Sequence, residues 1–266
     1  MSTGTDDGSD AEVVRDEFGP DDGVLVASHL TKRFGGLTAV DDLSFAVEKQ
    51  EILGFIGPNG AGKSTTFNCI TGRYPPTEGT VYYRGEDVTG STAYEMVNKG
   101  LARTFQEFRP FRDRTVLANL QTALVPDQLF STSGLLGETR ARAIDLCERV
   151  GLGDDLYRTP DELPHAGMLR LEIGRAMATD PDLMLVDEPF AGLAEGEIGH
   201  LSALLNELRD EGTTLVVVDH NMRGLLSLID RAIVINFGSK IAEGTPEEIR
   251  QDPAVQEAYL GAEDEA

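Results

Sequence analysis

The sequence of 266 residues has no long run of apolar residues. Its longest apolar runs are short, such as Leu-Val-Val-Val at residues 215–218, whereas a membrane-spanning helix needs about 20 mostly apolar residues. The N-terminal residues are polar and acidic and do not form the apolar core of a secretory signal peptide. We therefore expect a cytoplasmic protein that reaches a membrane only through its partners.

Cysteine and basic residues are scarce as well. The two cysteines, Cys69 and Cys147, lie in helix-like patterns, which favours reduced, buried thiols over a disulfide. Lysine occurs only five times, and 46 acidic residues against 23 basic residues give a net charge of −23. This charge argues against free nucleic acid or an anionic lipid surface as a partner. It fits either an ordinary acidic soluble protein or adaptation to high salt, which screens the repulsion between carboxylates.

One glycine-rich stretch carries most of the functional information. Residues 57–65 read Gly-Pro-Asn-Gly-Ala-Gly-Lys-Ser-Thr and match the phosphate-binding pattern G-x-x-x-x-G-K-[ST]. We call these nine residues the phosphate loop. An apolar, strand-like run precedes them at residues 52–56, and residues 65–71 can begin a helix. A glycine-rich surface turn is the alternative, but it does not require this strand–loop–helix context.

The phosphate loop predicts a site for ATP and Mg²⁺. Its backbone N–H groups can cradle phosphate oxygens at the N-terminus of the helix. The Lys63 side chain can reach the β- and γ-phosphates, and the Ser64 hydroxyl can hold Mg²⁺. The predicted nucleotide-binding residues of the loop are Gly57, Pro58, Asn59, Gly60, Ala61, Gly62, Lys63, Ser64 and Thr65.

Two carboxylates end a second apolar strand pattern at residues 183–187. In proteins with a phosphate loop, an aspartate at such a strand end organises Mg²⁺, and here that residue is Asp187. The next carboxylate, Glu188, can polarise the attacking water as a general base. The alternative is that both carboxylates only cap the turn that follows.

Three further residues are candidates for the same site. His220 follows the strand pattern at 214–219 and can contact the γ-phosphate and the attacking water, although a lone histidine is often only structural. Gln106 lies where the core meets a helical block and can sense the γ-phosphate and Mg²⁺; it is otherwise a polar loop residue. Phe34 can stack on the adenine ring, or it packs at the edge of the fold.

The order of patterns predicts an α/β protein with a phosphate-loop NTPase core. β-like segments occur near residues 24–29, 43–48, 51–56 and 79–84, and parallel-sheet signals near 182–187 and 213–219 are each followed by a helix pattern. A strand pair is expected at 231–236 and 239–243, with a turn at Phe237-Gly238. Helical spacing at 118–125, 138–150 and 168–179 predicts a helical block, about residues 110–180, inserted into the core. Residues 1–23 and 262–266 are expected to be acidic, disordered tails.

Taken together, these motifs resemble the ATPase subunit of an ABC transporter over residues 24–261. The similarity is strongest to the ATPases of branched-chain amino-acid importers, and it is carried by Phe-Gly-Gly-Leu-Thr-Ala-Val at 34–40, Leu-Ala-Arg-Thr-Phe-Gln at 101–106, and Leu-Glu-Ile-Gly-Arg-Ala at 171–176. Ile-Ala-Glu-Gly-Thr-Pro at 241–246 and Ala-Tyr-Leu-Gly at 258–261 are also similar to that subgroup.

The resemblance implies a two-lobed ATPase domain with an antiparallel β subdomain and an inserted helical subdomain. In the family, two such domains pair head to tail and sandwich two ATP molecules, each between one phosphate loop and the partner's signature loop. In the family, membrane permease subunits dock near the loop that carries the glutamine, here Gln106. The chain is therefore expected at the inner face of the membrane. An extracytoplasmic substrate-binding protein would be an indirect partner.

One motif departs from the family pattern. The family signature is usually Leu-Ser-Gly-Gly-Gln, and often Leu-Pro-Tyr-Gly-Gln in the importer subgroup, whereas residues 163–167 read Leu-Pro-His-Ala-Gly. Pro164 fits the subgroup, but Ala166 and Gly167 do not, and Ala166 would be strained if its position required a positive φ. The loop at 191–194, Ala-Gly-Leu-Ala, also lacks the polar residue that the family usually has at the end of this loop. We therefore expect a heterodimer with a second, different ATPase, although a homodimer is possible.

Two other functions stay open at this point. The chain can be the ATPase of another ABC system, such as lipid or lipopolysaccharide export, or a soluble ABC protein outside transport. It can also be a nucleotide-gated subunit with little hydrolysis, which the divergent signature favours and which Glu188 and His220 argue against.

Overall fold

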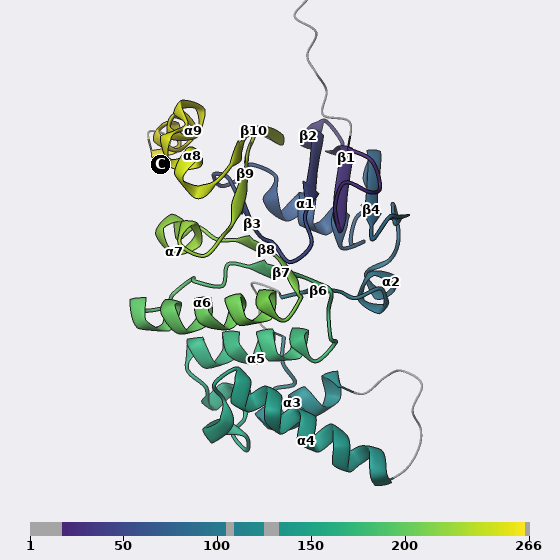
Figure 1. The fold of residues 1–266 in the computed structure, drawn as a ribbon, viewed down its shortest axis with the longest axis vertical. Helices are drawn as coiled ribbons and strands as arrows, with labels where there is room; N and C mark the ends of the chain where they lie inside the picture. The colour runs from purple at the N-terminus through teal and green to yellow at the C-terminus, as the bar shows by residue number, and fades with distance from the viewer. Residues whose placement is uncertain (1–17, 105–108, 125–132, 264–266) are drawn as a thin grey trace, which may run out of the picture.

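The computed structural model describes residues 18–104, 109–124 and 133–263, and it contains two sheets with helices packed around them (Figure 1). Gln106 lies outside the described residues. Within the described ranges, no helix is both long and apolar enough to cross a membrane.

A six-stranded sheet forms the centre of the molecule, in the strand order β10-β9-β3-β8-β7-β6. Neighbouring strands are parallel except for the β9–β10 pair, a hairpin that turns at Phe237 and Gly238, both with positive φ. The strands are β3 (Ile52–Ile56), β6 (Leu101–Arg103), β7 (Leu183–Asp187), β8 (Thr214–Val218), β9 (Arg231–Asn236) and β10 (Ser239–Gly244). The predicted parallel strands and the predicted hairpin are confirmed.

A four-stranded antiparallel sheet packs beside this core, in the order β2-β1-β4-β5. Its strands are β1 (Leu25–Phe34), β2 (Leu37–Val47), β4 (Glu78–Tyr83) and β5 (Glu86–Asp87). The three longer strands lie where the sequence patterns predicted them. Helix α1 (Lys63–Ile70) lies between this sheet and the central one, so the phosphate loop sits where the two sheets meet (Figure 1).

Every described regular element between residues 110 and 180 is helical. The α-helices here are α3 (Val116–Ala123), α4 (Ser133–Arg149) and α5 (His165–Met177), and the 3-10 helices are η1 (Gly153–Asp155) and η2 (Pro160–Glu162). The three predicted helices are confirmed, with ends shifted by one to five residues. The remaining helices are α2 (Ala93–Asn98), α6 (Glu195–Asp210), α7 (Met222–Leu226), α8 (Pro246–Gln251) and α9 (Pro253–Glu263).

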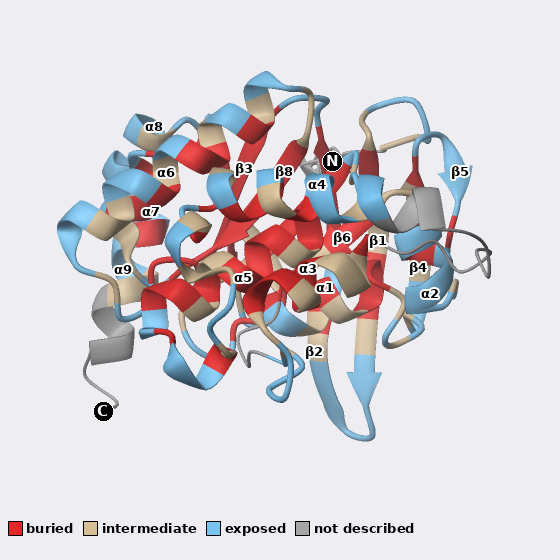
Figure 2. Ribbon diagram, turned by 90° about the horizontal axis from the view of Figure 1, so that it is seen from below, coloured by how far each residue is buried: buried red, intermediate tan, exposed pale blue. Residues whose placement is uncertain are grey.

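The central sheet is covered on both faces, which explains why its strands read as continuous apolar runs. Alternate residues of strand β7 enter different apolar clusters: Met184 and Val186 pack with α5 and α6, whereas Leu183 and Leu185 pack toward α1 and the antiparallel sheet. Figure 2 shows the strands as a buried layer beneath helices whose outer faces are exposed. Such a sheet is rigid, and it fixes the loops that leave its strand ends.

Candidate functional site: a nucleotide cleft at the carboxyl edge of the sheet

Most of the predicted site residues come from the carboxyl ends of three neighbouring strands, whereas Phe34 belongs to β1 of the antiparallel sheet. Strand β3 pairs with β8, and β8 pairs with β7, all in parallel. The phosphate loop follows β3, Asp187 ends β7 and Glu188 follows it, and His220 comes shortly after β8. Because parallel strands place their carboxyl ends at one edge of a sheet, residues far apart in sequence meet there.

The phosphate loop folds around the Lys63 side chain. The Lys63 Nζ donates hydrogen bonds to the carbonyl oxygens of Gly57, at 2.5 Å, and Pro58, at 2.9 Å. Lys63 as a whole is only 8% exposed. Burial lowers the pKa of Lys63 from its ordinary value, while the charges of Glu188 and Asp187 raise it by less. The ammonium is thus held at the floor of the loop beside two carboxylates.

Two glycines of the loop are required by close approach of the backbone. A Cβ on Gly57 would lie 2.4 Å from the carbonyl oxygen of Ile235. A Cβ on Gly62 would lie 2.4 Å from the carbonyl oxygen of Ala39, and Gly62 has a φ of 106°. Gly62 is also the N-cap of α1, so this conformation directs the first N–H groups of the helix toward the loop.

Asp187 is held by an arginine from the neighbouring strand. Arg103, at the end of β6, forms an ion pair with Asp187 at 2.9 Å, and both side chains are largely buried. The Asp187 N–H donates to the Thr104 hydroxyl at 3.1 Å. A second Arg103 nitrogen donates to the Asn68 side-chain oxygen of α1 at 2.8 Å. This network ties the end of β7 to the helix that follows the phosphate loop.

Glu188 and His220 contact each other directly. The His220 Nε2 lies 3.0 Å from the Glu188 Oε1. The Glu188 side chain is 17% exposed and the His220 side chain 48% exposed. The carboxylate is therefore largely shielded from solvent, whereas the imidazole is half exposed. Glu188 has a φ of 52°, and its N–H donates to the Val218 carbonyl at 2.7 Å.

Many of the predicted site residues line one cleft of about 690 Å³, whereas Gly57, Pro58 and Asp187 are not among its lining residues. Its walls include Phe34 of β1, most of the phosphate loop, and both members of the Glu188–His220 pair. Phe34 is 43% exposed, and its ring meets the Tyr74 ring edge to face with centroids 5.6 Å apart. Phe34 thus both lines the cleft and packs on Tyr74, and its stacking on an adenine ring stays a prediction.

The donors for a metal ion are few but of the right type. Ser64 is exposed in the first turn of α1 and lines the cleft, and Asp187 supplies a carboxylate at the adjacent strand end. In the described part of the chain, no group of three or more histidine, cysteine, aspartate or glutamate side chains is arranged to hold a metal. Mg²⁺ at this place would therefore depend on phosphate oxygens and water, as it commonly does in phosphate-transferring sites.

Three residues that the sequence patterns did not single out belong to this region. Asp219 lies between β8 and His220, is 5% exposed, and accepts two backbone hydrogen bonds. Arg103 holds Asp187 as described above. Tyr259 of α9 reaches the phosphate loop and the segment after His220: its hydroxyl lies 3.7 Å from the Met222 Sδ, and a backbone hydrogen bond from Gly57 partly offsets the rise in its pKa that burial causes.

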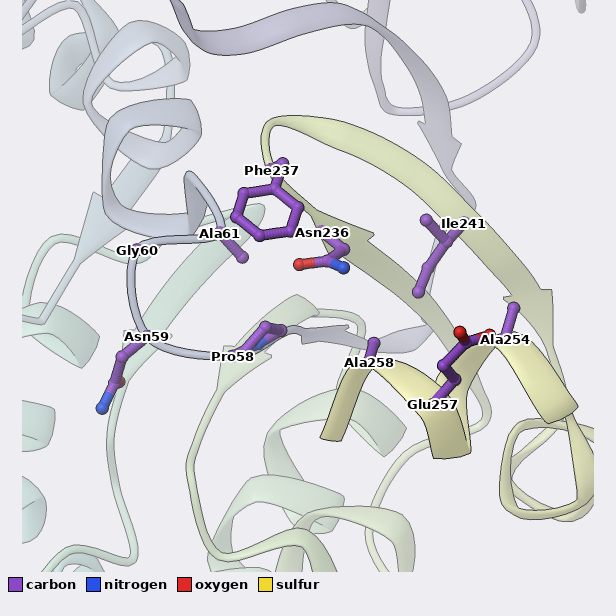
Figure 3. A pocket seen from close by; sticks show the side chains of 10 residues that line it. All are labelled: Pro58, Asn59, Gly60, Ala61, Asn236, Phe237, Ile241, Ala254, Glu257 and Ala258. Carbon is purple, nitrogen blue, oxygen red and sulfur yellow. The ribbon is translucent and has the colours of Figure 1, made fainter. Parts of the chain in front are cut away.

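Helix α9 also forms a second hollow behind the phosphate loop, of about 450 Å³ (Figure 3). Pro58 and Ala61 of the loop, Phe237 of the β9–β10 turn, and Glu257 of α9 lie around it, whereas Asn59 points away from the other labelled side chains. The phosphate loop is thus flanked by the 690 Å³ cleft on one side and by the C-terminal segment on the other.

The divergent signature forms the start of helix α5. Pro164 is the N-cap, and helix α5 begins at His165. Ala166 is helical and does not have a positive φ. The backbone strain that a positive φ would cause at this alanine is therefore absent. The His165 Nε2 lies 3.0 Å from the carbonyl oxygen of Ala191, in the turn that follows Glu188.

Comparison with known proteins agrees with this geometry. The family profile described as ABC transporter matches residues 40–191, and the profile described as branched-chain amino acid ATP-binding cassette transporter matches residues 239–265. The chain is 41% identical over 251 residues to the high-affinity branched-chain amino acid transport ATP-binding protein LivG of Escherichia coli (strain K12), covering 90% of this chain and 98% of LivG. It is 39% identical to the corresponding protein BraF of Pseudomonas aeruginosa (strain PAO1), covering 90% of this chain and 98% of BraF.

The chain also resembles solved structures in its fold. The crystal structure of MJ1267, described as an ATP-binding cassette of an ABC transporter, superposes with a TM-score of 0.81 at 33% identity. The superposition covers 89% of this chain and 98% of MJ1267. The chain therefore belongs to the ATP-binding proteins of the ABC transporter family.

Proposed function

We propose that the cleft binds ATP with Mg²⁺ and hydrolyses it, and that this hydrolysis powers import of branched-chain amino acids through membrane permease subunits. The observation that carries the proposal is the single cleft lined by Lys63, Glu188 and His220. A buried ammonium, a phosphate-binding loop and a carboxylate–imidazole pair in one cavity are the groups that phosphoryl transfer to water requires.

Each residue has a role that follows from its position. The Lys63 ammonium and the N–H groups at the start of α1 bind the phosphate oxygens and stabilise negative charge that develops in the transition state. Glu188 accepts a proton from the attacking water, because its carboxylate lines the cleft and is sheltered from bulk solvent. His220, 3.0 Å from Glu188, orients that carboxylate and can contact the γ-phosphate. We assign the sensing of the γ-phosphate and the metal to Gln106.

The proposed metal ligands are Ser64, Asp187 and Gln106. Mg²⁺, when bound, would supply positive charge that offsets the negative charge of the phosphates. Arg103 would orient the Asp187 carboxylate for this role through their ion pair. Phe34 stacks on the adenine ring in this proposal, since it lines the cleft beside the phosphate loop.

Two variants of the assembled transporter test the hydrolysis mechanism. Lys63→Ala should abolish tight ATP binding, because it removes the cation that the loop encloses. Glu188→Gln should keep binding but remove turnover, since the amide preserves shape and cannot take a proton. Binding is measured with labelled ATP and turnover by phosphate release. If Glu188→Gln hydrolyses ATP at the wild-type rate, Glu188 is not the general base.

The substrate assignment has its own support. The C-terminal profile and the names of LivG and BraF both refer to branched-chain amino acids. Export of lipid or lipopolysaccharide is the alternative, and so is a nucleotide-gated role with little hydrolysis. Purification of the complex from its native membrane decides between them: import predicts permeases together with an extracytoplasmic amino-acid-binding protein. We place the chain at the cytoplasmic face of that membrane.

We further propose pairing with a second, different ATPase. In the family arrangement, Pro164 would face the partner's nucleotide without an N–H group or a hydroxyl to offer. A lost hydrogen bond to a charged phosphate costs about 1.5–3 kcal/mol, which slows a site by roughly one to two orders of magnitude. The site built on Lys63 and Glu188 should then do most of the hydrolysis. If this chain's Glu188→Gln leaves most ATPase activity and the partner's equivalent variant removes it, the asymmetry is wrong.

A further inference from the structure

Asp219 is a buried carboxylate next to the proposed active site. It is 5% exposed and lies between the end of β8 and His220. Its two oxygens accept from two different segments: Oδ2 from the Phe190 N–H at 2.6 Å and Oδ1 from the Asn221 N–H at 2.7 Å. Hydrogen bonds from N–H groups to a carboxylate are stronger than those between neutral groups, so both segments are held firmly.

The segment that Asp219 holds contains the proposed general base. Glu188 has a φ of 52°, a conformation that non-glycine residues adopt only when their surroundings enforce it. Its N–H donates to the Val218 carbonyl at 2.7 Å, on one side of the turn. The Phe190 N–H donates to Asp219 on the other side. Two bonds, two residues apart, therefore fix the backbone around Glu188.

A third contact closes the same turn. The Ala191 carbonyl lies 3.0 Å from the His165 Nε2, and Gly192, with a φ of 72°, lies beside that ring. The turn from Glu188 to Gly192 is thus attached to β8, to Asp219 and to the start of α5. Of these three contacts, the hydrogen bond to Asp219 is the one that links the turn to the residue directly before His220.

We propose that Asp219 is a positioning residue for hydrolysis: it fixes the turn at Phe190 and the backbone at Asn221, and so sets how Glu188 and His220 meet. The proposal rests on the assignment of Glu188 as the general base. Asp219 does not touch the cleft and takes no part in proton transfer. It acts through the peptide groups on either side of the Glu188–His220 pair.

The chemistry of the site explains why a carboxylate is needed. Both partners of Asp219 are N–H donors, and an ionised carboxylate has an acceptor oxygen for each. An asparagine amide offers one oxygen and one NH₂ group, and the NH₂ group would oppose a backbone N–H. Burial and the nearby Glu188 charge raise the pKa of Asp219 overall, although the Asn221 and Phe190 N–H groups and the His220 charge act to lower it.

The test uses Asp219→Asn in the assembled transporter. Loss of one hydrogen bond to the carboxylate should lower kcat for ATP about tenfold or more, while KM for ATP changes less than about twofold. Glu51→Gln is the control, because Glu51 is a buried carboxylate at the opposite edge of the sheet that accepts the Glu48 N–H at 2.8 Å and also pairs with Arg231 at 2.8 Å. It should reduce thermal stability and leave kcat unchanged. Should Asp219→Asn fail to assemble, Asp219→Ser is used in its place, since its smaller side chain keeps one acceptor.

A double-variant cycle separates positioning from a general loss of structure. In the Glu188→Gln background, Asp219→Asn should not lower the residual single-turnover rate further, because there is no base left to position. An equal loss in both backgrounds, or an unchanged kcat in the folded Asp219 variants, overturns the proposal. If Glu188→Gln is inactive and Asp219→Asn is normal, the positioning role alone fails. If Glu188→Gln is fully active, the general base itself was misassigned.

Discussion

Gly62 offers a quantitative test of the phosphate loop, because its replacement by alanine meets two separate obstacles. Gly62 has a φ of 106°, and left-handed backbone costs a residue with a Cβ roughly 1–2 kcal/mol. The new Cβ would also lie 2.4 Å from the carbonyl oxygen of Ala39. Both groups are backbone or directly attached to it, so relief requires movement of β2 or of the loop. Overpacking of this kind costs roughly a further 1–3 kcal/mol.

Gly212 is the matched control for the first obstacle. It has a φ of 116°, but a Cβ there meets no atom within 4 Å. Gly212→Ala should therefore lower the stability of the subunit by roughly 1–2 kcal/mol, which corresponds to about 2–8 °C in Tm for a domain of this size. It should leave ATP affinity unchanged, because Gly212 joins α6 to β8 on the side of the sheet away from the cleft.

Two measurements on the purified subunit compare the variants. Thermal unfolding should show a larger loss for Gly62→Ala than for Gly212→Ala, by roughly 1–3 kcal/mol. Titration with a fluorescent ATP analogue should show at least about tenfold weaker binding for Gly62→Ala alone, since the loop that turns its N–H groups toward the phosphates must shift. Equal stability and equal affinity of the two variants would refute the argument from close approach.

Three further predictions concern the rest of the chain. The chain has 46 acidic and only 23 basic side chains, so repulsion between carboxylates should destabilise it at low salt. Thermal stability should therefore rise between low and molar KCl, as the Debye length falls from about 30 Å to about 3 Å. Equal melting temperatures would leave the acidic composition unexplained. Burial raises the pKa of Cys69 and of Cys147 from 9.0 to about 11, so their contribution to stability is complete below about pH 9 and is lost as pH rises toward 11; slow alkylation at about pH 8, measured by mass spectrometry, would agree with this. Tyr259→Phe should weaken ATP binding about two- to tenfold, because it removes the hydroxyl that joins α9 to Gly57 and Met222, and unchanged affinity would exclude that link.

The strands and the cleft could be predicted from sequence because their signals are local. A five-residue apolar run such as β3 or β8 needs burial on both faces, and the positive φ of Gly60 and Gly62 is a local property of the phosphate loop. The strand ends that carry Asp187 and His220 follow from the same runs. Parallel pairing then brings them together without any further information.

The elements that the sequence did not reveal depend on contacts between distant residues. Strand β6 is only three residues long, too short for a periodic pattern, and it exists because it pairs with β7. Arg103 and Asp187 are 84 residues apart in sequence, so their ion pair follows only from that pairing. The conformation of Ala166 was equally hidden, since the helical pattern was recognised only from residue 168.

Asp219 illustrates a signal that was present but not specific. A carboxylate at the end of an apolar strand, directly before a candidate site histidine, is unusual enough to examine. Sequence alone does not tell whether such a carboxylate faces the cleft or the interior. Its burial and its bond to the Phe190 N–H come from the turn after β7, which is a neighbour in space only.

The most direct test of the proposed function is amino-acid uptake by the reconstituted transporter. Proteoliposomes containing the complete complex, with the amino-acid-binding protein supplied outside and Mg-ATP enclosed, are assayed for uptake of radiolabelled leucine. We predict ATP-dependent uptake with the wild-type chain and none above background with Glu188→Gln, although that variant still binds ATP. Uptake at the wild-type rate with Glu188→Gln, or no uptake of leucine, isoleucine or valine by an active ATPase, would contradict the account.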